Sequence, residues 1–221
     1  MTGRFYKVNG ERYPSVTTIL QILEKSGLAK WRGNVGNKEA DRISEEARTY
    51  GTAIHALIER VNLGDRGPFG TDEDFFVKPY IDWYDANVTC ILGAERLIVS
   101  RKLRFAGTAD AVAMLNGDAE AAILDLKTSK TDLARREWEL QLAAYALGLE
   151  EEGIACRRRI ILRMPKTTPG VLHIHELSAD ELERDQKAFL NVLKIWRWHH
   201  EKGPVVAKPA GPRIKFKDTL R

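Results

Sequence analysis

The chain has 221 residues, enough for one domain with a sizeable hydrophobic core. Its two cysteines lie far apart and form no CxxC pair, so nothing in the composition supports a zinc site, an iron–sulfur cluster or a disulfide framework. The apolar runs are too short for a signal peptide or a membrane span, so we expect a cytoplasmic protein without membrane attachment. The formal net charge of +4 permits nucleic acid as a partner but does not require it.

The N-terminal part of the chain is expected to be mainly helical. Asn9-Gly10 accepts the positive φ angles of a tight turn, and a short β-hairpin is therefore expected over residues 5–13. Ser15 is the expected N-cap of the helix that follows. Apolar residues at helical spacing predict three helices, over residues 16–25, 44–62 and 72–89.

Strand and helix signals alternate further along the chain. Alternating apolar patterns bounded by turn residues predict strands over residues 90–103, 104–115, 121–127, 159–164 and 172–177. The first three are expected to be antiparallel neighbours, with a turn around Asn116-Gly117-Asp118 before the third. Asp132 is expected to cap a helix over residues 133–149, and Ser178 with Glu181 makes a capping box for the final helix.

This order of elements predicts an α/β fold with a mixed central β-sheet flanked by helices. We expect one domain over residues 1–202, in which residues 1–89 form the mainly helical N-terminal part and residues 90–202 hold the sheet core and the C-terminal helix. Prolines and glycines argue against regular structure beyond that point. Residues 203–221 are therefore expected to be a basic, Pro-containing tail.

One strand end carries the most informative chemistry. The nearly continuous apolar run 121–127 ends with Asp125 and Lys127 two residues apart, and period-2 geometry puts both on one face of the sheet. The preceding strand carries Asp110, and the turn allows two registers, with Asp110 across from either Asp125 or Ile123. Both registers leave the two carboxylates on one face, with Cβ atoms roughly 5 Å apart in the first and roughly 7–8 Å apart in the second.

Two buried carboxylates side by side repel each other, and a hard divalent cation with oxygen ligands relieves that repulsion. Mg²⁺ is the expected ion, and Mn²⁺ is expected to substitute for it. Lys127 would then orient the attacking water and stabilise negative charge in the transition state, which is the chemistry of phosphodiester hydrolysis without a covalent intermediate. A salt-bridged hairpin is the simpler alternative, because Asp-x-Lys alone is common near strand ends.

Several motifs occur together, in order, within residues 13–150. They are Gly51-Thr52-Ala53-Ile54-His55 with Glu59, Gly107-Thr108-Ala109-Asp110, Asp125-Leu126-Lys127-Thr128-Ser129, and Gln141 with Tyr145 as Q-x-x-x-Y. Together they resemble the RecB-type exonuclease branch of the PD-(D/E)XK nuclease superfamily, which implies a restriction-endonuclease-like core. The segment 14–20, followed by Trp31, is similar to the opening of the mitochondrial genome maintenance exonucleases and related phage exonucleases.

The resemblance implies roles for individual residues. The implied metal ligands are His55, Asp110, Asp125 and the backbone carbonyl of Leu126. Lys127 corresponds to the catalytic lysine, and Gln141 and Tyr145, one helical turn apart, would contact that lysine and the DNA backbone. Glu95 stands at a frequent acidic position of the family, where it would bind a second cation or only order its water.

The activity that the resemblance implies is that of a metal-dependent DNA exonuclease. Such an enzyme would thread a free or single-stranded DNA end and would act in recombination, repair or phage DNA processing. A structure-selective endonuclease on the same core is one alternative, and a non-catalytic DNA-binding scaffold is another. The oligomeric state stays open.

Two further groups of residues attract attention without joining the site. His173 and His175 would share one face of a strand and could bind a transition metal, but no third ligand is visible in the sequence. The run from Arg157 to Arg159 could contact phosphates, although a charge cluster is more often a solvated face.

Overall fold

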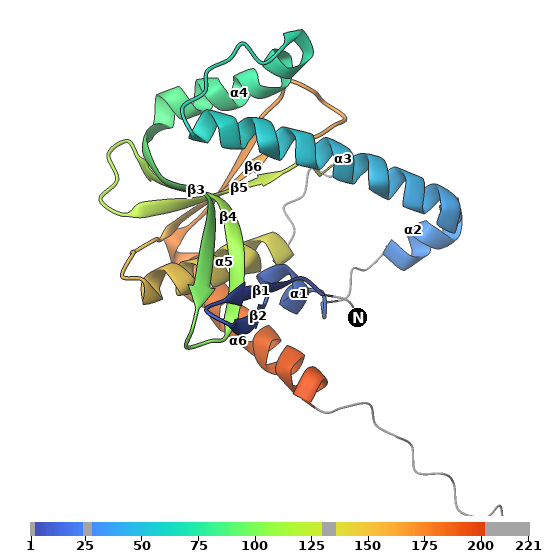
Figure 1. Ribbon diagram of the computed structural model, residues 1–221, viewed down its shortest axis with the longest axis vertical. Coiled ribbons are helices and arrows are strands. Elements are labelled where there is room, and N and C mark those ends of the chain that lie inside the picture. Colours follow the sequence, from blue (N-terminus) through green and yellow to red (C-terminus); the bar gives the residue numbers. More distant parts are fainter. Residues whose placement is uncertain (1–2, 24–27, 130–135, 202–221) are drawn as a thin grey trace, which may run out of the picture.

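A five-stranded β-sheet with helices on both faces forms the centre of the protein (Figure 1). The computed structural model describes residues 3–23, 28–129 and 136–201. The sheet strands, in spatial order, are β3 (Val88–Ser100), β4 (Phe105–Leu115), β5 (Ala121–Lys127), β6 (Arg158–Arg163) and β7 (His173–Leu177). Within this sheet β5 and β6 pair in parallel and the other neighbours pair antiparallel, so the predicted α/β class with a mixed sheet is confirmed.

The helices divide between the two faces of the sheet because the strands alternate. The helices are α1 (Val16–Leu20), α2 (Leu28–Val35), α3 (Asn37–Asn62), α4 (Thr71–Asn87), α5 (Arg136–Glu151) and α6 (Ala179–Glu201). Along β5, Ile123 packs with α1, α5 and α6, whereas Leu124 and Leu126 pack on the other face with α3 and α4. Asp125 and Lys127 have the parity of Ile123 and therefore belong to the α5 face.

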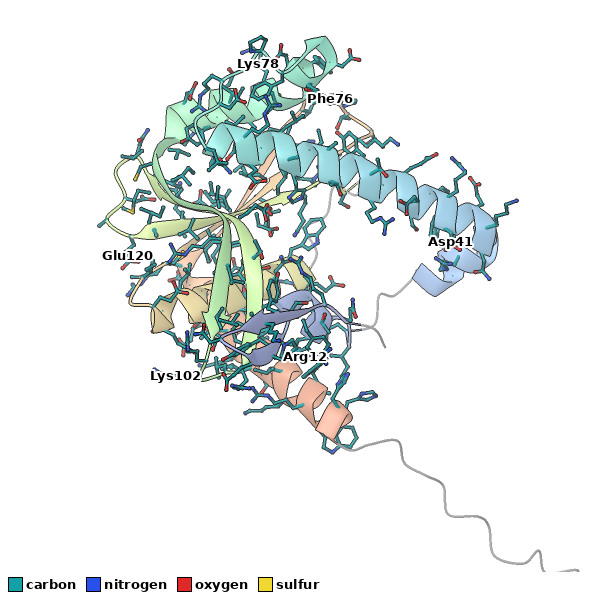
Figure 2. The ribbon with its side chains drawn as sticks, in the orientation of Figure 1. Arg12, Asp41, Phe76, Lys78, Lys102 and Glu120 are labelled. Atoms are coloured by element: carbon teal, nitrogen blue, oxygen red, sulfur yellow. The ribbon has the colours of Figure 1, made fainter. Side chains whose placement is uncertain are left out.

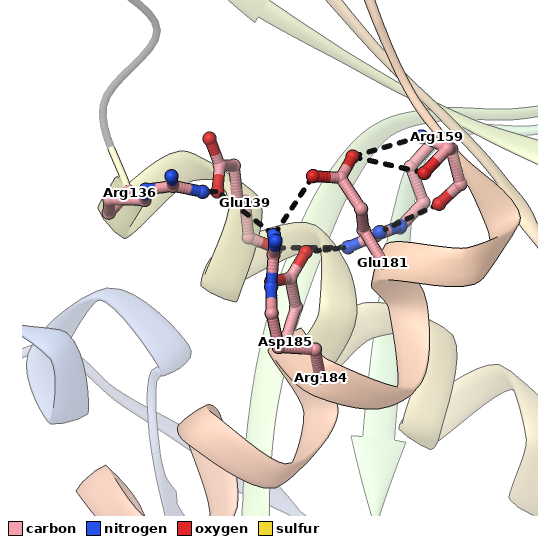
Figure 3. A network of polar contacts seen from close by, with 7 residues as sticks. Arg136, Glu139, Arg159, Glu181, Arg184 and Asp185 are labelled. Carbon is pink, nitrogen blue, oxygen red and sulfur yellow. Dashed lines mark hydrogen bonds and ion pairs between the residues drawn. The ribbon is translucent and has the colours of Figure 1, made fainter.

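A buried ion pair ties the α5 face together (Figure 3). Arg159 on β6 is fully buried and its Nη1 is 2.9 Å from Oδ2 of Asp185 on α6. The same guanidinium group donates a hydrogen bond to the backbone carbonyl of Glu139 on α5. Arg158 is engaged as well, in ion pairs with Asp118 and Glu176. These two arginines hold strands and helices in place, so the suggestion that they contact phosphates is wrong for Arg159 and unsupported for Arg158.

The N-terminal hairpin forms as predicted. Its strands are β1 (Phe5–Val8) and β2 (Glu11–Pro14), and Asn9 and Gly10 both have positive φ, as a two-residue hairpin turn of this kind requires. Ser15 caps α1 by accepting a hydrogen bond from the backbone N–H of Thr18.

Several element boundaries differ from the prediction. The helix predicted over residues 16–25 ends at Leu20, and α2 was not predicted at all. The helix predicted from Ser44 begins at Asn37. Its first turns escaped prediction because they carry no apolar stripe. Ion pairs of Arg42 with Glu39 and Glu46 support these turns instead. This part of α3, marked by Asp41 in Figure 2, projects beyond the sheet in that view.

The later boundaries shift by smaller amounts. The strand predicted to reach residue 103 ends at Ser100, and a turn that closes with Arg104 at positive φ leads into β4. The helix predicted over residues 133–149 is described from Arg136 to Glu151, and its predicted cap, Asp132, lies outside the described residues, as does the tail 203–221. No helix in the described part of the chain is long and apolar enough to cross a membrane.

Candidate active site

A cavity of about 650 Å³ opens at the end of β5, between α3, the N-terminal hairpin, α1 and α5. The predicted site side chains that line it are His55, Glu95, Asp110, Asp125, Lys127, Gln141 and Tyr145. Leu126 was predicted to take part through its backbone, and its side chain packs into the core on the α3 face of the sheet. Segments from both halves of the chain therefore meet around one cavity.

The cavity exists because β4 and β5 stop pairing before β5 ends. The paired residues of these strands end at Ala111 with Leu124, whereas β5 stays paired with β6 as far as Lys127. In the gap, Oδ2 of Asp110 accepts a hydrogen bond from the backbone N–H of Leu126 at 2.5 Å. A side chain thus replaces the backbone partner that the neighbouring strand no longer supplies.

The register settles which of the two predicted strand alignments occurs. Ala111 lies opposite Leu124, so continuing the ladder by one step puts Asp110 across from Asp125. Because the N–H and C=O groups of one strand residue point to the same side, the carbonyl of Leu126 also faces Asp110. Both carboxylates and this carbonyl therefore converge on one place.

A chain of polar contacts connects Asp125 with α5. The Nζ of Lys127 lies 2.5 Å from Oδ2 of Asp125, without the alignment of a hydrogen bond, and donates a hydrogen bond to Oε1 of Gln141 at 3.2 Å. The amide of Gln141 donates in turn to Oδ1 of Asp125 at 3.3 Å and to the hydroxyl oxygen of Tyr145 at 2.9 Å. Gln141 and Tyr145 therefore position the lysine and the carboxylate relative to each other.

A second group of ligand atoms lies on the other side of Asp110. One ligand atom each from His55, Glu95 and Asp110 can be chosen so that all lie within 4.8 Å of one another, the single such group of three found among the described residues. His55 comes from α3, and its Nδ1 is 3.2 Å from Oδ1 of Asp110. One carboxylate oxygen of Asp110 accepts a hydrogen bond from the backbone of Leu126, and the other lies beside His55. Asp110 therefore joins the two halves of the site.

Glu95 has an unusual backbone conformation. In the β3–β4 ladder Ala94 pairs with Ala111 and Arg96 with Ala109, so Glu95 lies opposite Asp110. Its φ is +43°, in the left-handed region, where a residue with a side chain is disfavoured by about 1–2 kcal/mol. Strain of this kind persists where the surrounding structure imposes it, often at functional sites.

Burial and crowding disturb the protonation of these groups. Burial, together with the charge of Asp110, raises the pKa of Asp125 to about 6 even though Lys127 opposes the shift. Burial and the same charge also raise the pKa of Glu95. Burial lowers the pKa of His55, but its hydrogen bond to Asp110 and the charge of that group together raise the pKa above its usual value. A nearby positive charge would therefore stabilise the ionised forms of Asp125 and Glu95.

The donor set fits a hard divalent cation. Three carboxylates and a backbone carbonyl offer oxygen ligands, and one imidazole completes them. The buried Oδ2 of Asp125 has no hydrogen-bond partner among the described residues and lies 2.5 Å from Nζ of Lys127, while His55 lies beside Asp110, so each of these two carboxylates has a basic side chain next to it. The carbonyl of Leu126 and the acidic and imidazole side chains that line the cavity could therefore hold such an ion with little movement of the side chains.

The sequence alone did not predict every residue around the cavity. Arg4 and Tyr6 of the N-terminal hairpin also line it, and the hydroxyl of Tyr6 is hydrogen-bonded to Oγ1 of Thr108 at 2.9 Å, across 102 positions of the chain. A hairpin that shows only strand signals gives no sign of such a distant contact. The available clue was the two-residue spacing of Tyr6 in β1 and Arg4 just before it, which puts both side chains on one side of an extended segment.

Gly107 provides a stability test of this packing. A Cβ atom at position 107 would lie 2.3 Å from Cε1 of Tyr145. We expect Gly107→Ala to destabilise the protein by about 1–3 kcal/mol through overpacking, and to lower activity because Tyr145 must move. Urea unfolding measures the first effect. Gly33→Ala is the control, because a Cβ atom at this position in α2 would meet nothing within 4 Å among the described residues outside its own helix backbone and chain neighbours, and it is expected to stabilise by about 0.5–1 kcal/mol.

A match to one protein-family model agrees with the geometry. The family model described as "PD-(D/E)XK nuclease superfamily" matches residues 76–210, a range that includes Asp110, Asp125 and Lys127 but not His55. A search of curated proteins finds no match. The crystal structure of SSO0001 is similar with a TM-score of 0.37 and 14% identity, covering 89% of this chain and 85% of that one. An alkaline exonuclease (LHK-Exo) from Laribacter hongkongensis has a TM-score of 0.38 and 10% identity, with 85% and 90% covered.

Proposed function

Because the chain belongs to the PD-(D/E)XK nuclease superfamily, it is a phosphodiester hydrolase with the restriction-endonuclease-like fold, and we propose that it acts as a Mg²⁺-dependent exonuclease on DNA. The observation that carries this proposal is the convergence of Asp110, Asp125 and Lys127 in one cavity at the end of β5. We further propose that residues 1–202 form a single nuclease domain, since both clusters of core residues pack on the same sheet.

Each side chain has a defined part in the proposed reaction. His55, Glu95, Asp110, Asp125 and the carbonyl of Leu126 would hold the metal. When bound, a divalent cation neutralises phosphate charge and makes water a better nucleophile. Lys127 would orient the attacking water and stabilise the charge that develops on the phosphorus oxygens.

Gln141 and Tyr145 would act from α5. Gln141 contacts both Lys127 and Asp125, so it would keep the ammonium group directed at the reacting phosphate. Burial raises the pKa of Tyr145 well above its usual value, so its hydroxyl stays protonated and can donate a hydrogen bond to a DNA phosphate.

Two alternatives remain distinguishable by experiment. A structure-selective endonuclease would use the same residues, and a DNA-binding scaffold would not need the complete set of ionisable groups that lines this cavity. End-labelled linear DNA and closed circular DNA, single- and double-stranded, should be incubated with and without Mg²⁺. An exonuclease degrades the linear DNA and leaves circles intact; cleavage of circles would indicate an endonuclease, and no cleavage at all would indicate a scaffold.

Metal binding is expected to depend on pH through Asp125. Its pKa is raised from 3.8 to about 6, so between these pH values the folded protein holds more protons than the unfolded chain, and without metal its stability falls as the pH rises through this window. Metal ions bind the deprotonated carboxylate. The increase in melting temperature on adding Mg²⁺ should therefore be small at about pH 5 and larger at about pH 7. A shift that does not change with pH, measured against KCl at equal ionic strength, would contradict this.

A further inference from the structure

A second cavity, of about 470 Å³, lies over β6 and β7 beside the active site. Its lining residues are Trp138, Ile161, Arg163, Thr168, His173, Ile174 and His175. This set combines an indole ring, a guanidinium group and two imidazoles, and none of the described lining residues is acidic. Such a combination suits a ligand that carries both negative charge and flat rings.

The cavity continues a row of residues that starts at the active site. Lys127 on β5 is the register partner of Arg163 on β6, which in turn is the register partner of His173 on β7. Register partners project from the same face of a sheet, so these three basic residues form one row across the strands. With neighbouring strands about 4.8 Å apart, His173 lies roughly 10 Å from Lys127 along this row.

Trp138 stands between the two cavities. The Nζ of Lys127, which lines the first cavity, is 5.9 Å from the centroid of the Trp138 ring, and Trp138 lines the second. A strand of DNA that has its reacting phosphate beside Lys127 would therefore meet the indole ring next and the imidazoles after it. Aromatic rings stack on unpaired bases of any sequence, and imidazole N–H groups can donate to phosphate oxygens.

We propose that this second cavity binds the single-stranded segment of the DNA substrate that lies next to the reacting phosphate. The inference rests on the proposed nuclease function and adds the place where the strand is held outside the catalytic cavity. His173 and His175 contact DNA in this arrangement and take no part in the chemical step. A transition-metal site is the less favoured use of these histidines, because the group of three metal-ligating side chains found among the described residues is the one in the active site.

The test removes both imidazoles and leaves the active site intact. The variant His173→Ala/His175→Ala is compared with His199→Ala/His200→Ala, which removes two histidines from the far end of α6. Both side chains at positions 173 and 175 are exposed, so the variant should keep its melting temperature, and the single variant His173→Ala serves if it does not. Binding of a fluorescein-labelled oligothymidylate is measured by anisotropy in EDTA, so that no cleavage occurs.

We expect the 173/175 variant to bind the oligothymidylate about tenfold more weakly, and the 199/200 variant to bind like the native protein. Hydrolysis of thymidine 5′-(p-nitrophenyl phosphate) in Mg²⁺, a substrate too small to reach the second cavity, should not change. Native-like binding by the 173/175 variant would overturn the proposal, and so would an equal loss with duplex DNA or with the small substrate. Zn²⁺ binding that disappears in this variant while oligothymidylate binding stays native would assign the histidines to a metal instead.

The two proposals fail in different ways. If the native protein hydrolyses neither DNA nor the small substrate, the nuclease function is wrong, while the binding measurement in EDTA still decides whether the second cavity holds single-stranded DNA. If hydrolysis occurs but the 173/175 variant binds normally, the nuclease function stands and the second cavity has no role in holding the strand.

Discussion

Replacing Lys127 with alanine should reduce DNA cleavage by about 10³-fold or more while DNA binding stays measurable. The ammonium group lies 2.5 Å from Oδ2 of Asp125, where the proposed reaction places the phosphate, and alanine leaves no charge at that position. Single-turnover cleavage of end-labelled DNA in saturating Mg²⁺ measures the effect. Lys187→Ala removes an exposed lysine that pairs with Glu183 on α6, and it should leave the rate unchanged.

The same substitution should change how the protein responds to metal. Lys127 and a divalent cation compete for the carboxylate of Asp125, so removing the ammonium group should leave the Mg²⁺-dependent rise in melting temperature intact or enlarge it. Without metal, Lys127→Ala leaves a buried carboxylate without its partner and should melt at a lower temperature. Cleavage within a few-fold of the native rate would refute the role assigned to Lys127.

Replacing Asp125 with asparagine is expected to have the second large effect, of about 10³-fold on cleavage, but for a different reason. Asparagine keeps the size of the side chain and removes the charge that a metal ligand must supply at this fully enclosed position. In contrast to Lys127→Ala, this variant should lose most of the Mg²⁺-dependent rise in melting temperature. Differential scanning fluorimetry with increasing Mg²⁺ separates the two cases.

Asp118→Asn is the matched control for this change. Asp118 is also an aspartate in an ion pair, with Arg158 at 2.8 Å, but it lies at the β4–β5 turn, at the opposite end of β5 from the active site. Its substitution should alter neither cleavage nor the response to Mg²⁺. If Asp125→Asn kept the full metal response, Asp125 would not be a ligand, and the cation would have to be held by the group around His55 and Glu95 alone.

Much of the site could be predicted from the sequence because its chemistry is local. The spacing of Asp125 and Lys127 determines that both project from one face of β5, whatever the rest of the fold does. The turn after β4 limited Asp110 to two registers, both on the same face, and the nearly continuous apolar run over residues 121–127 forms the predicted strand, with Ile123 in one core cluster and Leu124 in the other. The hairpin at Asn9-Gly10 and the cap at Ser15 are local for the same reason.

Tertiary structure alone decided how these pieces become a site. The end of pairing between β4 and β5 opens the cavity and turns the Asp110 carboxylate toward the backbone of Leu126, and no local pattern in either strand encodes that gap. The position of His55 depends on the packing of α3 against the sheet, where Gly51 allows close approach to Thr128. Tyr6 reaches Thr108 only because the hairpin docks beside β4.

The row from Lys127 through Arg163 to His173 shows the same division. From the sequence alone, each of the three is only a polar residue in a strand. The register that aligns them depends on the parallel pairing of β5 with β6, which requires the connection through α5. Periodicity along the chain determines which face a side chain occupies, since it follows from the geometry of one strand. Which faces meet, and where strands separate, depends on interactions between residues far apart in the sequence, and those are determined only by the packing of the whole domain.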